Sequence, residues 1–467
     1  MLLAILLGSL GQLGPFEAGQ QWNGTWSGIA AARPDSGLQV GLRLRILTSG
    51  DTVRVGLTLP ESRLVGLELP SPYSDSSFAT IQKGVLHVEF TPDIGLAVIG
   101  GLVARDSERI VFEGRLDDRF PNRLNGQITI TRYSSPIVLR RLLPGSQFEA
   151  PVTFMNPNDS LRLGGTLILP HTSTHPPVVV FVTGSDPDTR DAWRYEATVL
   201  ADHGVASLLY DKRGVGESSG ASHDLASWDD LAGDVEGAIT YLAHRPDLVD
   251  TTRIGLIGQS QGTWIIAKVA SRDRRVKYMV SVAGSGISAA EQETYRTGAL
   301  MHAAGFADSD VAHAVAFQRQ KFAVARTGLG WERLDSMMRR LRADSVRWFP
   351  GYGTGAATRS LAVLRLYGVL QFNYDPIADL EQIVAPTLVI MGEKDLNFPP
   401  SVVVEHMQRA LNHAGNRCVN SRIIPNATHG LLVTQSYHGR FFRRVISEDF
   451  LNVLTTWVPT TVSCTNR

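Results

Sequence analysis

The sequence predicts a mostly parallel, doubly wound α/β sheet with a helical insertion, preceded by a small all-β domain. Three features carry this prediction: period-two apolar alternation in residues 20–142, alternating strand-like and helix-like segments from residue 150, and helical patterns alone in residues 285–374. Strands that alternate with helices form parallel sheets, whereas period-two runs form antiparallel strands with one buried face. The two parts therefore belong to different fold classes.

Length and composition are consistent with two or more folded units. The chain has 467 residues, and a single core usually stops growing near roughly 250–300 residues. Apolar residues make up 43% of the chain, which excludes a disordered protein. Lysine plus arginine and aspartate plus glutamate both number 45, so the formal net charge is zero. Without a basic stripe or an RNA-binding motif, no nucleic-acid partner is expected.

Residues 1–18 are expected to be a signal peptide, which makes the protein secreted or periplasmic. The run Met1–Leu10 is apolar and of signal-peptide length, and it is too short to span a bilayer. It lacks preceding basic residues and a clean cleavage site, so a trimmed start or a short packed segment is the alternative. No later segment has the roughly 18 unbroken apolar residues of a transmembrane helix.

Two cysteines are present, Cys418 and Cys464, with no C-x-x-C pair and no cysteine–histidine cluster. A structural zinc site is therefore not expected, and neither is any other metal. In an exported protein the two cysteines could form one disulfide that ties the C-terminal tail to the body. The alternative is two unrelated thiols.

Residues 20–142 are expected to form an all-β domain, either a barrel or a sandwich. Apolar residues alternate with other types from Leu38 to Ile46 and again from Val53 to Leu59. Shorter alternating runs follow near residues 86–90 and 128–130. Turn residues separate these runs, as in antiparallel sheets with one buried face.

Residues 150–284 and 375–459 are expected to form the α/β domain. Its first buried strand is Val178–Val182, because a continuous β-branched run is typical of a strand covered on both faces. Strand and helix then alternate, and a final helix is predicted over Arg440–Trp457.

Residues 285–374 interrupt this alternation and are interpreted as a helical lid. The insertion lies just before a late strand, where ligands bind at the carboxyl ends of the strands. Most of its apolar side chains are expected to pack the lid onto the body, and a minority are expected to face the pocket. Examples are Phe317, Phe322, Met337, Met338 and Phe349.

A nucleophile elbow is predicted at Gly258-Gln259-Ser260-Gln261-Gly262, which matches G-x-S-x-G. The motif follows an apolar run and precedes a helix-like segment, which is the strand–turn–helix context that it requires. Ser260 is the candidate nucleophile. The backbone N–H of Gln261 opens the helix, where it can stabilise an oxyanion.

The candidate base is His429. A serine hydroxyl needs a base that removes its proton, and in such sheets the chain order is serine, acid, histidine. His429 directly follows the last strand predicted in the sheet, whereas His406 and His413 lie inside a predicted helix and His438 lies further out.

The candidate acid is Asp395, in the loop that follows the strand Pro386–Met391. Glu393 lies two residues earlier and is the alternative acid, with a solvated loop charge as its other interpretation. The spacing alone does not choose between them.

Two further loops are expected to border the site. The loop Thr183–Asp188 follows a buried strand, and the N–H of Ser185, or alternatively of Asp186, is the candidate second oxyanion donor. The glycine-rich loop Tyr210–Ser218 lacks the order of a phosphate-binding loop. Its Asp211 and Arg213 are expected to be structural and to pair with each other.

Several motifs together resemble those of secreted bacterial α/β-hydrolases of the esterase and serine-aminopeptidase-like group that carry an N-terminal β-domain. The matching segments are Trp22-x-Gly24-x-Trp26, Gly184-Ser185-x-Pro187-x-x-Arg190-Asp191, Asp211-x-Arg213-Gly214-x-Gly216-x-Ser218, Gly258-x-Ser260-x-Gly262, Gly392-Glu393-x-Asp395 and Thr428-His429-Gly430. The resemblance covers nearly the whole chain.

The resemblance implies a serine esterase with Ser260, Asp395 and His429 as catalytic triad, a small-molecule ester as substrate and no cofactor. Two positions depart from the pattern. Gln259 stands where relatives often have histidine, and Asp186 stands where they often have glycine. A peptidase of the same fold, a thioesterase or acyltransferase, and a catalytically silent binding protein remain alternatives.

Overall fold

The structure is a computed structural model that describes residues 20–31, 39–49, 52–59, 64–69, 78–90, 110–130, 133–142, 148–170, 173–221, 223–353, 358–437 and 440–460. The expected signal peptide, residues 1–18, lies outside the described residues, so secretion stays a prediction. Cys418 is disulfide-bonded, and the other cysteine of the sequence, Cys464, lies outside the described residues. The described chain divides into two compact units, one ending with Leu142 and the other beginning with Phe148.

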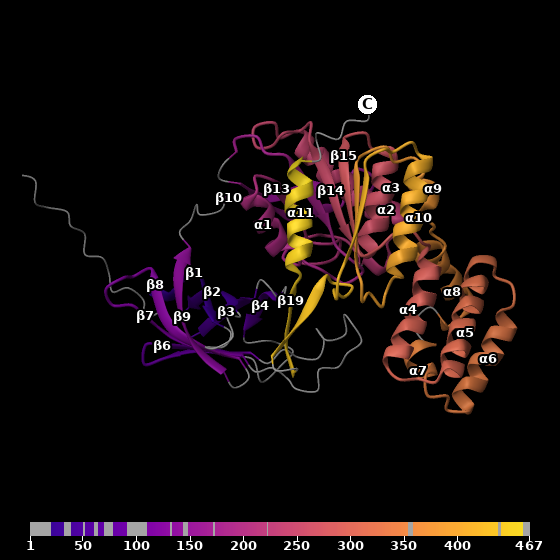
Figure 1. The fold of residues 1–467 in the computed structure, drawn as a ribbon, viewed down its shortest axis with the longest axis horizontal. Coiled ribbons are helices and arrows are strands. Elements are labelled where there is room, and N and C mark those ends of the chain that lie inside the picture. The colour runs from indigo at the N-terminus through magenta and orange to yellow at the C-terminus, as the bar shows by residue number, and fades with distance from the viewer. Residues whose placement is uncertain are drawn as a thin grey trace, which may run out of the picture. The chain divides into compact units, whose positions relative to one another are not determined.

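The first unit is a nine-stranded sheet, as far as its strands are described, in the order β4-β3-β2-β1-β9-β8-β7-β6-β5. Every pairing in it is antiparallel. The edge strands β4 and β5 are consecutive in the chain, and β3 contacts β5, so the sheet curls as in a barrel (Figure 1). The strands are β1 (Gly24–Ala31), β2 (Gln39–Ser49), β3 (Thr52–Leu59), β4 (Leu64–Leu69), β5 (Phe78–Gln82), β6 (Val85–Phe90), β7 (Ile110–Leu116), β8 (Arg123–Ile130) and β9 (Tyr133–Leu142).

One face of this sheet is apolar and buried, as the period-two pattern predicts. Trp26, Leu44, Phe112 and Leu139 are fully buried and alternate with more exposed residues along their strands. The indole Nε1 of Trp26 donates a hydrogen bond of 2.8 Å to the carbonyl of Trp22 in the 3₁₀ turn Gln20–Trp22. Both tryptophans of the Trp-x-Gly-x-Trp segment therefore serve the core of this unit.

The second unit contains an eight-stranded sheet in the order β10-β11-β13-β12-β14-β15-β16-β17. The strand β11 is antiparallel to both neighbours, and the strands from β13 to β17 are parallel. Its strands are β10 (Phe148–Met155), β11 (Arg162–Leu169), β12 (Val178–Val182), β13 (Ala206–Tyr210), β14 (Ile254–Gln259), β15 (Val276–Val282), β16 (Thr387–Gly392) and β17 (Val419–Ile424).

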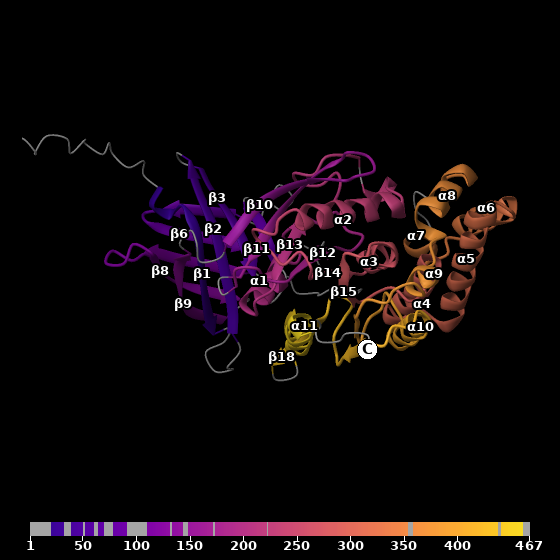
Figure 2. The same cartoon turned by 90° about the horizontal axis from the view of Figure 1, so that it is seen from above.

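Helices cover both faces of this sheet, which is why its central strands are apolar throughout (Figures 1 and 2). The helices α1 and α11 pack on one face, and α2, α3 and α10 pack on the other. Their bounds are α1 (Arg194–Asp202), α2 (Trp228–Ala243), α3 (Gln261–Arg272), α9 (Ile377–Leu380), α10 (Pro400–His413) and α11 (Glu448–Thr460). The predicted fold class, a doubly wound, mostly parallel sheet with a helical insertion and an N-terminal all-β domain, is confirmed.

The helical insertion between β15 and β16 has a core of its own. Its elements are α4 (Ala289–Ala303), α5 (Asp308–Thr327), α6 (Trp331–Ala343), α7 (Phe349–Tyr352), α8 (Leu361–Tyr367) and the π-helical turn Gly368–Phe372. Phe317, Met338 and Phe349 bury their side chains in a cluster made of insertion residues. The expectation that these residues pack the insertion onto the body is therefore wrong, because several amphipathic helices in sequence can bury their apolar faces against one another.

Two further segments differ from the sequence predictions. The strand β10 was not predicted, and the predicted helix Arg440–Trp457 begins only at Glu448. The residues before Glu448 form an antiparallel hairpin of β18 (Leu432–Tyr437) and β19 (Arg440–Ile446). Among the described residues, no helix is both long and apolar enough to cross a membrane.

Candidate active site

Ser260 occupies a strained turn between β14 and α3. Its backbone has φ 52° and ψ −119°, a region that residues other than glycine rarely adopt. Gly262 allows the turn to approach strand β12, because a Cβ at this position would lie 2.1 Å from the carbonyl oxygen of Val182. The turn thereby presents Ser260 at the carboxyl end of β14, where the sequence motif predicts it.

Asp395 and His429 are hydrogen-bonded to each other. The Oδ2 atom of Asp395 lies 2.8 Å from the Nδ1 atom of His429, and both residues are buried. The other carboxylate oxygen, Oδ1, accepts the backbone N–H groups of Asn397 at 2.7 Å and Phe398 at 3.0 Å. The Phe398 ring also stacks on the imidazole, with 5.8 Å between ring centroids. Both members of this pair are therefore held in place from two sides.

The second imidazole nitrogen, Nε2 of His429, faces the nucleophile elbow. The side-chain amide nitrogen of Gln259 lies 3.4 Å from it. Within the described residues, no hydrogen bond joins His429 to the hydroxyl of Ser260. Such bonds are often long in ligand-free enzymes and tighten only with substrate.

Glu393, the alternative acid, lies outside this arrangement. It is exposed, and its carboxylate accepts the backbone N–H of Asn426 at 2.7 Å. The structure thus places His429 against Asp395, whereas Glu393 stabilises a turn at the surface.

The two candidate oxyanion donors lie beside Ser260. A Cβ placed on Gly184 would lie 3.3 Å from the Cβ of Ser260, so the Thr183–Asp188 loop runs directly past the serine. The N–H groups of Ser185 and Gln261 have no hydrogen-bond partner in the part of the chain that the structure describes. Unpaired donors next to a serine are what an oxyanion site requires.

The same loop carries a carboxyl group with a raised pKa. Burial is the largest cause and raises the pKa of Asp188 to about 6, against the opposing effect of the Lys212 ammonium. Asp186 is exposed and adds to the rise. Asp188 is therefore partly protonated in weakly acidic solution.

Asp188→Asn is expected to change how stability depends on pH. Between about pH 4 and 6 the folded protein holds a proton on Asp188 that the unfolded chain has lost, so this group stabilises the fold less as pH rises. The asparagine variant does not lose stability in this way as pH rises. From pH 4 to 6 its free energy of unfolding should therefore increase by about 1–3 kcal/mol relative to that of the parent. Urea unfolding from pH 4 to 7 measures the difference. A constant difference between the two proteins would remove Asp188 as the titrating group.

The glycine-rich loop after β13 is structural, but its predicted internal pair does not form. Asp211 binds Arg190, with 2.6 Å between Oδ2 and Nη2, and Arg213 binds Asp234 with contacts of 2.7 and 2.8 Å. The chain between Asp211 and Arg213 is short, and the two side chains take partners from different elements. The prediction that they pair with each other is therefore wrong.

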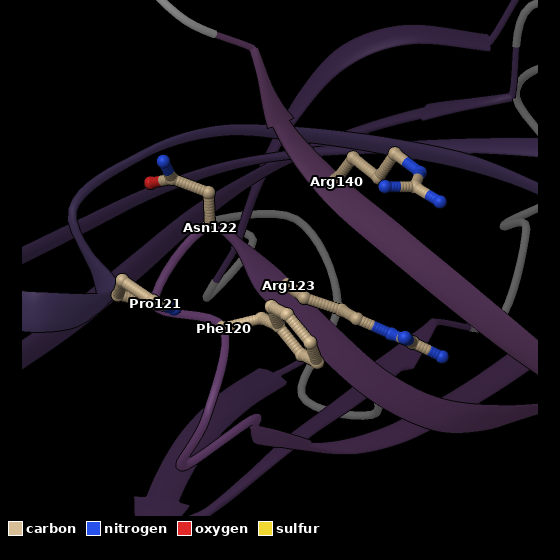
Figure 3. A pocket seen from close by; sticks show the side chains of 5 residues that line it. All are labelled: Phe120, Pro121, Asn122, Arg123 and Arg140. Carbon is tan, nitrogen blue, oxygen red and sulfur yellow. The ribbon is translucent and has the colours of Figure 1, made fainter.

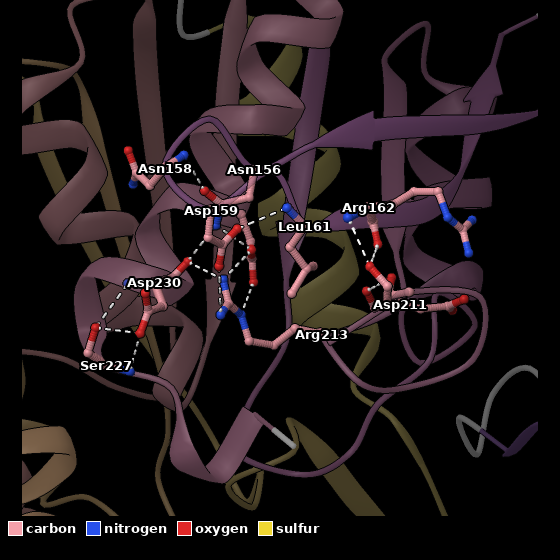
Figure 4. Close-up of polar contacts among 12 residues, drawn as sticks. Asn156, Asn158, Asp159, Leu161, Arg162, Asp211, Arg213, Ser227 and Asp230 are labelled. Atoms are coloured by element: carbon pink, nitrogen blue, oxygen red, sulfur yellow. Dashed lines mark hydrogen bonds and ion pairs between the residues drawn. The ribbon is translucent and has the colours of Figure 1, made fainter. Parts of the chain in front are cut away.

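Arg213 lies in a buried polar network that joins the turn after β10, the helix α2 and this loop (Figure 4). Its Nη2 atom also donates to the carbonyl of Asp230 at 2.9 Å, and Asn156 donates to Asp234 at 2.8 Å. Buried polar groups need such partners, because each unmade bond costs about 1–3 kcal/mol. The network therefore holds the glycine-rich loop in position. We assign it a structural role and assign catalysis to other residues.

A hollow in the first unit lacks the groups needed for catalysis. It measures about 290 Å³ and is lined by Phe120, Pro121, Asn122, Arg123 and Arg140 (Figure 3). These residues include no nucleophile, carboxylate or histidine. In the described ranges, no three histidine, cysteine or acidic side chains gather as a metal site would require.

Sequence reasoning missed residues that contact the site from other elements. Lys212 and Gln371 both hydrogen-bond the side chain of Gln261, and Phe398 supports His429. The position of Lys212, two residues after the end of the apolar strand β13, is a usable sequence signal. Nothing in the local pattern marks Gln371, which comes from the helical insertion.

Comparison with known proteins identifies relatives of the second unit. The profile of the "Alpha/beta hydrolase family" matches residues 179–444. The uncharacterized protein YcjY of Escherichia coli K12 is 30% identical over 141 residues, which are 29% of this chain and 45% of that protein. The thiohydrolase aneE of Aspergillus aculeatus is 30% identical over 124 residues, which are 27% of this chain and 38% of that protein. The chain thus spans less than half the length of these curated relatives.

Solved structures also align with this chain at low identity. An esterase of Pyrococcus furiosus is 16% identical and aligns with 68% of this chain and 91% of its own, with a TM-score of 0.42.

Proposed function

Because this chain belongs to the alpha/beta hydrolase family, we propose that it is a serine hydrolase that cleaves small carboxylic esters through an acyl-enzyme. The observation that carries the proposal is the Asp395–His429 hydrogen bond beside a serine in a strained turn. A serine, a base and an orienting acid are the minimum set for this chemistry.

Each residue has one role in the proposed reaction. Ser260 attacks the ester carbonyl while His429 takes the hydroxyl proton. Asp395 orients the imidazole and stabilises its charged form. The N–H groups of Gln261 and Ser185 hold the developing oxyanion. The alcohol leaves with the proton from His429, and water then repeats the sequence on the acyl-enzyme.

A substrate panel tests the reaction class. We expect p-nitrophenyl esters of short acids to be hydrolysed and aminoacyl and dipeptidyl anilides to be hydrolysed far more slowly. Faster cleavage of the anilides would make the protein a peptidase of the same fold. No turnover of either class, with Ser260 unreactive to an active-site probe, would favour a silent binding protein.

A thioester substrate is the second candidate, because one curated relative is a thiohydrolase. The same acyl-enzyme route serves both substrates, since only the leaving group differs. A matched pair, such as butyryl N-acetylcysteamine and ethyl butyrate, separates the two. A kcat/KM much larger for the thioester than for the oxygen ester would assign the thiohydrolase activity.

The helical insertion is proposed to select the acyl group. Gln371 in its π-helical turn accepts a hydrogen bond of 3.2 Å from the Gln261 side chain, next to the nucleophile. It also donates to the carbonyl of Ala226 at 3.2 Å. The insertion therefore reaches the elbow, at the sheet edge where ligands of such folds bind.

Removing α5 to α8, residues 308–367, and bridging the gap with a short glycine–serine linker should change chain-length preference. We expect the ratio of kcat/KM between octanoyl and acetyl esters to shift by roughly tenfold, because pocket walls discriminate acyl groups by apolar contact. The insertion has its own core, so thermal unfolding of the rest should change little. A well-folded variant with an unchanged preference profile would reduce the insertion to a structural appendage.

A further inference from the structure

Lys212 is a buried cation whose hydrogen bonds all go to the two segments that carry the candidate oxyanion donors. It lies two residues after the end of β13, and only 4% of its surface is exposed. Its Nζ donates to the carbonyl of Gly184, to the carbonyl of Asp186 at 3.2 Å and to the Oε1 atom of Gln261 at 3.2 Å. One ammonium thus supplies its three protons to three acceptors around Ser260.

The bond to Gly184 sets the direction of the next amide. In a trans peptide the carbonyl and the following N–H point in opposite directions. Because the Gly184 carbonyl points inward to Lys212, the N–H of Ser185 points to the other side of that peptide. The carbonyl of Ser185 is held in turn by the imidazole of His223, with 2.8 Å between Nε2 and the oxygen. The carbonyl groups of two consecutive residues, Gly184 and Ser185, are therefore both held by buried side chains.

The hydrogen bond from Lys212 to the Gln261 side chain holds the residue that carries the other candidate oxyanion donor. The Gln261 side chain lies between Lys212 and Gln371, at 3.2 Å from each. Its side chain is buried, so the residue that opens α3 has little freedom to turn. The same ammonium is therefore connected to both backbone donors.

The surrounding charges favour the ammonium form, and burial opposes it. Asp188 and Asp186 on the loop, Asp224 on the 3₁₀ turn His223–Leu225 and Asp234 on α2 all attract the cation. Burial is the larger effect and lowers the pKa of Lys212 to about 8. In the described structure no carboxylate lies within 4 Å of the ammonium, so its hydrogen bonds go to carbonyl oxygens alone.

We propose that Lys212 is a positioning residue, which holds the Thr183–Asp188 loop and Gln261 so that the N–H groups of Ser185 and Gln261 face the carbonyl attacked by Ser260. The inference rests on the proposed hydrolase function and deepens it. An interior cation next to the oxyanion also stabilises negative charge there without entering the reaction.

Lys212→Met tests the proposal, because methionine keeps the unbranched side chain as far as Cε and removes the ammonium donors. We expect kcat to fall about 10–100-fold with KM changed less than about threefold, since the donors act mainly in the transition state. Amide exchange of the peptide covering residues 183–188 should become faster. Lys268→Met is the matched control, since Lys268 on α3 pairs with Asp229 at 3.3 Å and should leave both readouts at the parent values.

The pH profile supplies a readout that loss of packing would not mimic. In the parent, kcat should fall as pH rises through about 8, where the ammonium loses its charge and one donor. Burial raises the pKa of Asp188 only to about 6 and lowers the pKa of His223, so neither of these neighbours accounts for a change near pH 8. Lys212→Met should lack this alkaline limb. If the methionine variant does not fold, Lys212→Gln replaces it, because glutamine keeps two hydrogen-bond donors. The pH profile of this variant should also lack the decrease in kcat near pH 8.

The outcomes separate the inference from the function on which it rests. A folded Lys212 variant with parental kcat, or with parental exchange of residues 183–188, overturns the positioning role. Faster exchange with unchanged kcat overturns it as well. A parent without Ser260-dependent turnover overturns the proposed function instead, and the exchange measurement alone then decides whether Lys212 holds the loop.

Discussion

Ser260→Ala is expected to lower kcat by about 10⁶-fold, the size of the loss seen when a comparable triad loses its serine. The hydroxyl is the only group of Ser260 that the proposed reaction uses, and alanine keeps the rest of the turn. The Oγ atom has no hydrogen-bond partner in the described part of the chain, so the fold should not depend on it. Thermal unfolding of the variant should match the parent.

Ser285→Ala is the matched control for this variant. Ser285 is buried, and like Ser260 it has a positive φ, of 66°, and an Oγ that lacks a partner among the described residues. This variant also removes a serine Oγ, but from the loop after β15. Its turnover should stay at the parental rate. If Ser260→Ala retained turnover within about tenfold of the parent, another residue would be the nucleophile.

Asp395→Asn is expected to reduce kcat by about 10⁴-fold. The backbone N–H groups of Asn397 and Phe398 already donate to Oδ1, so the amide oxygen should occupy that position and the amide NH₂ should face His429. Nδ1 must then accept a hydrogen bond, and the ring proton moves to Nε2. A base with its proton on Nε2 cannot take another from Ser260.

Glu393→Gln is the control for the acid, and its effect should stay within about threefold, as for most surface substitutions. Its carboxylate accepts only the N–H of Asn426 in the described structure, and a glutamine oxygen can do the same. The reverse ranking of the two variants, measured as kcat on the same ester, would move the acid to Glu393.

The order of elements in the second unit was predictable from sequence because its signals are long and strong. The strand Val178–Val182 is a continuous β-branched run, and β14 leads into an unmistakable turn motif. The strand β10 was missed because Pro151 interrupts it and its buried face shows in only Val152 and Phe154. The sequence predicts a helix in place of β19, because this strand depends on pairing with β18, which no local pattern reveals.

The candidate site was predictable where chain order and loop position carry the information. Ser260, Asp395 and His429 each follow a strand that the pattern identifies. The supporting contacts could not be predicted from the sequence, because they join segments that lie far apart in the chain. They are the contacts of Arg190 with Asp211, of Lys212 with Gly184 and of Gln261 with Gln371. The choice between Asp395 and Glu393 likewise depends on side-chain direction, which spacing leaves open.

Locating the covalent adduct of a fluorophosphonate probe by mass spectrometry is the most direct test of the proposed mechanism. Trypsin should release Ile254–Lys268, a peptide in which Ser260 is the one serine. We predict a single adduct, on Ser260, in the parent protein and no adduct in Ser260→Ala. An adduct on a different serine, or equal labelling of both proteins, would contradict the assignment of Ser260 as nucleophile.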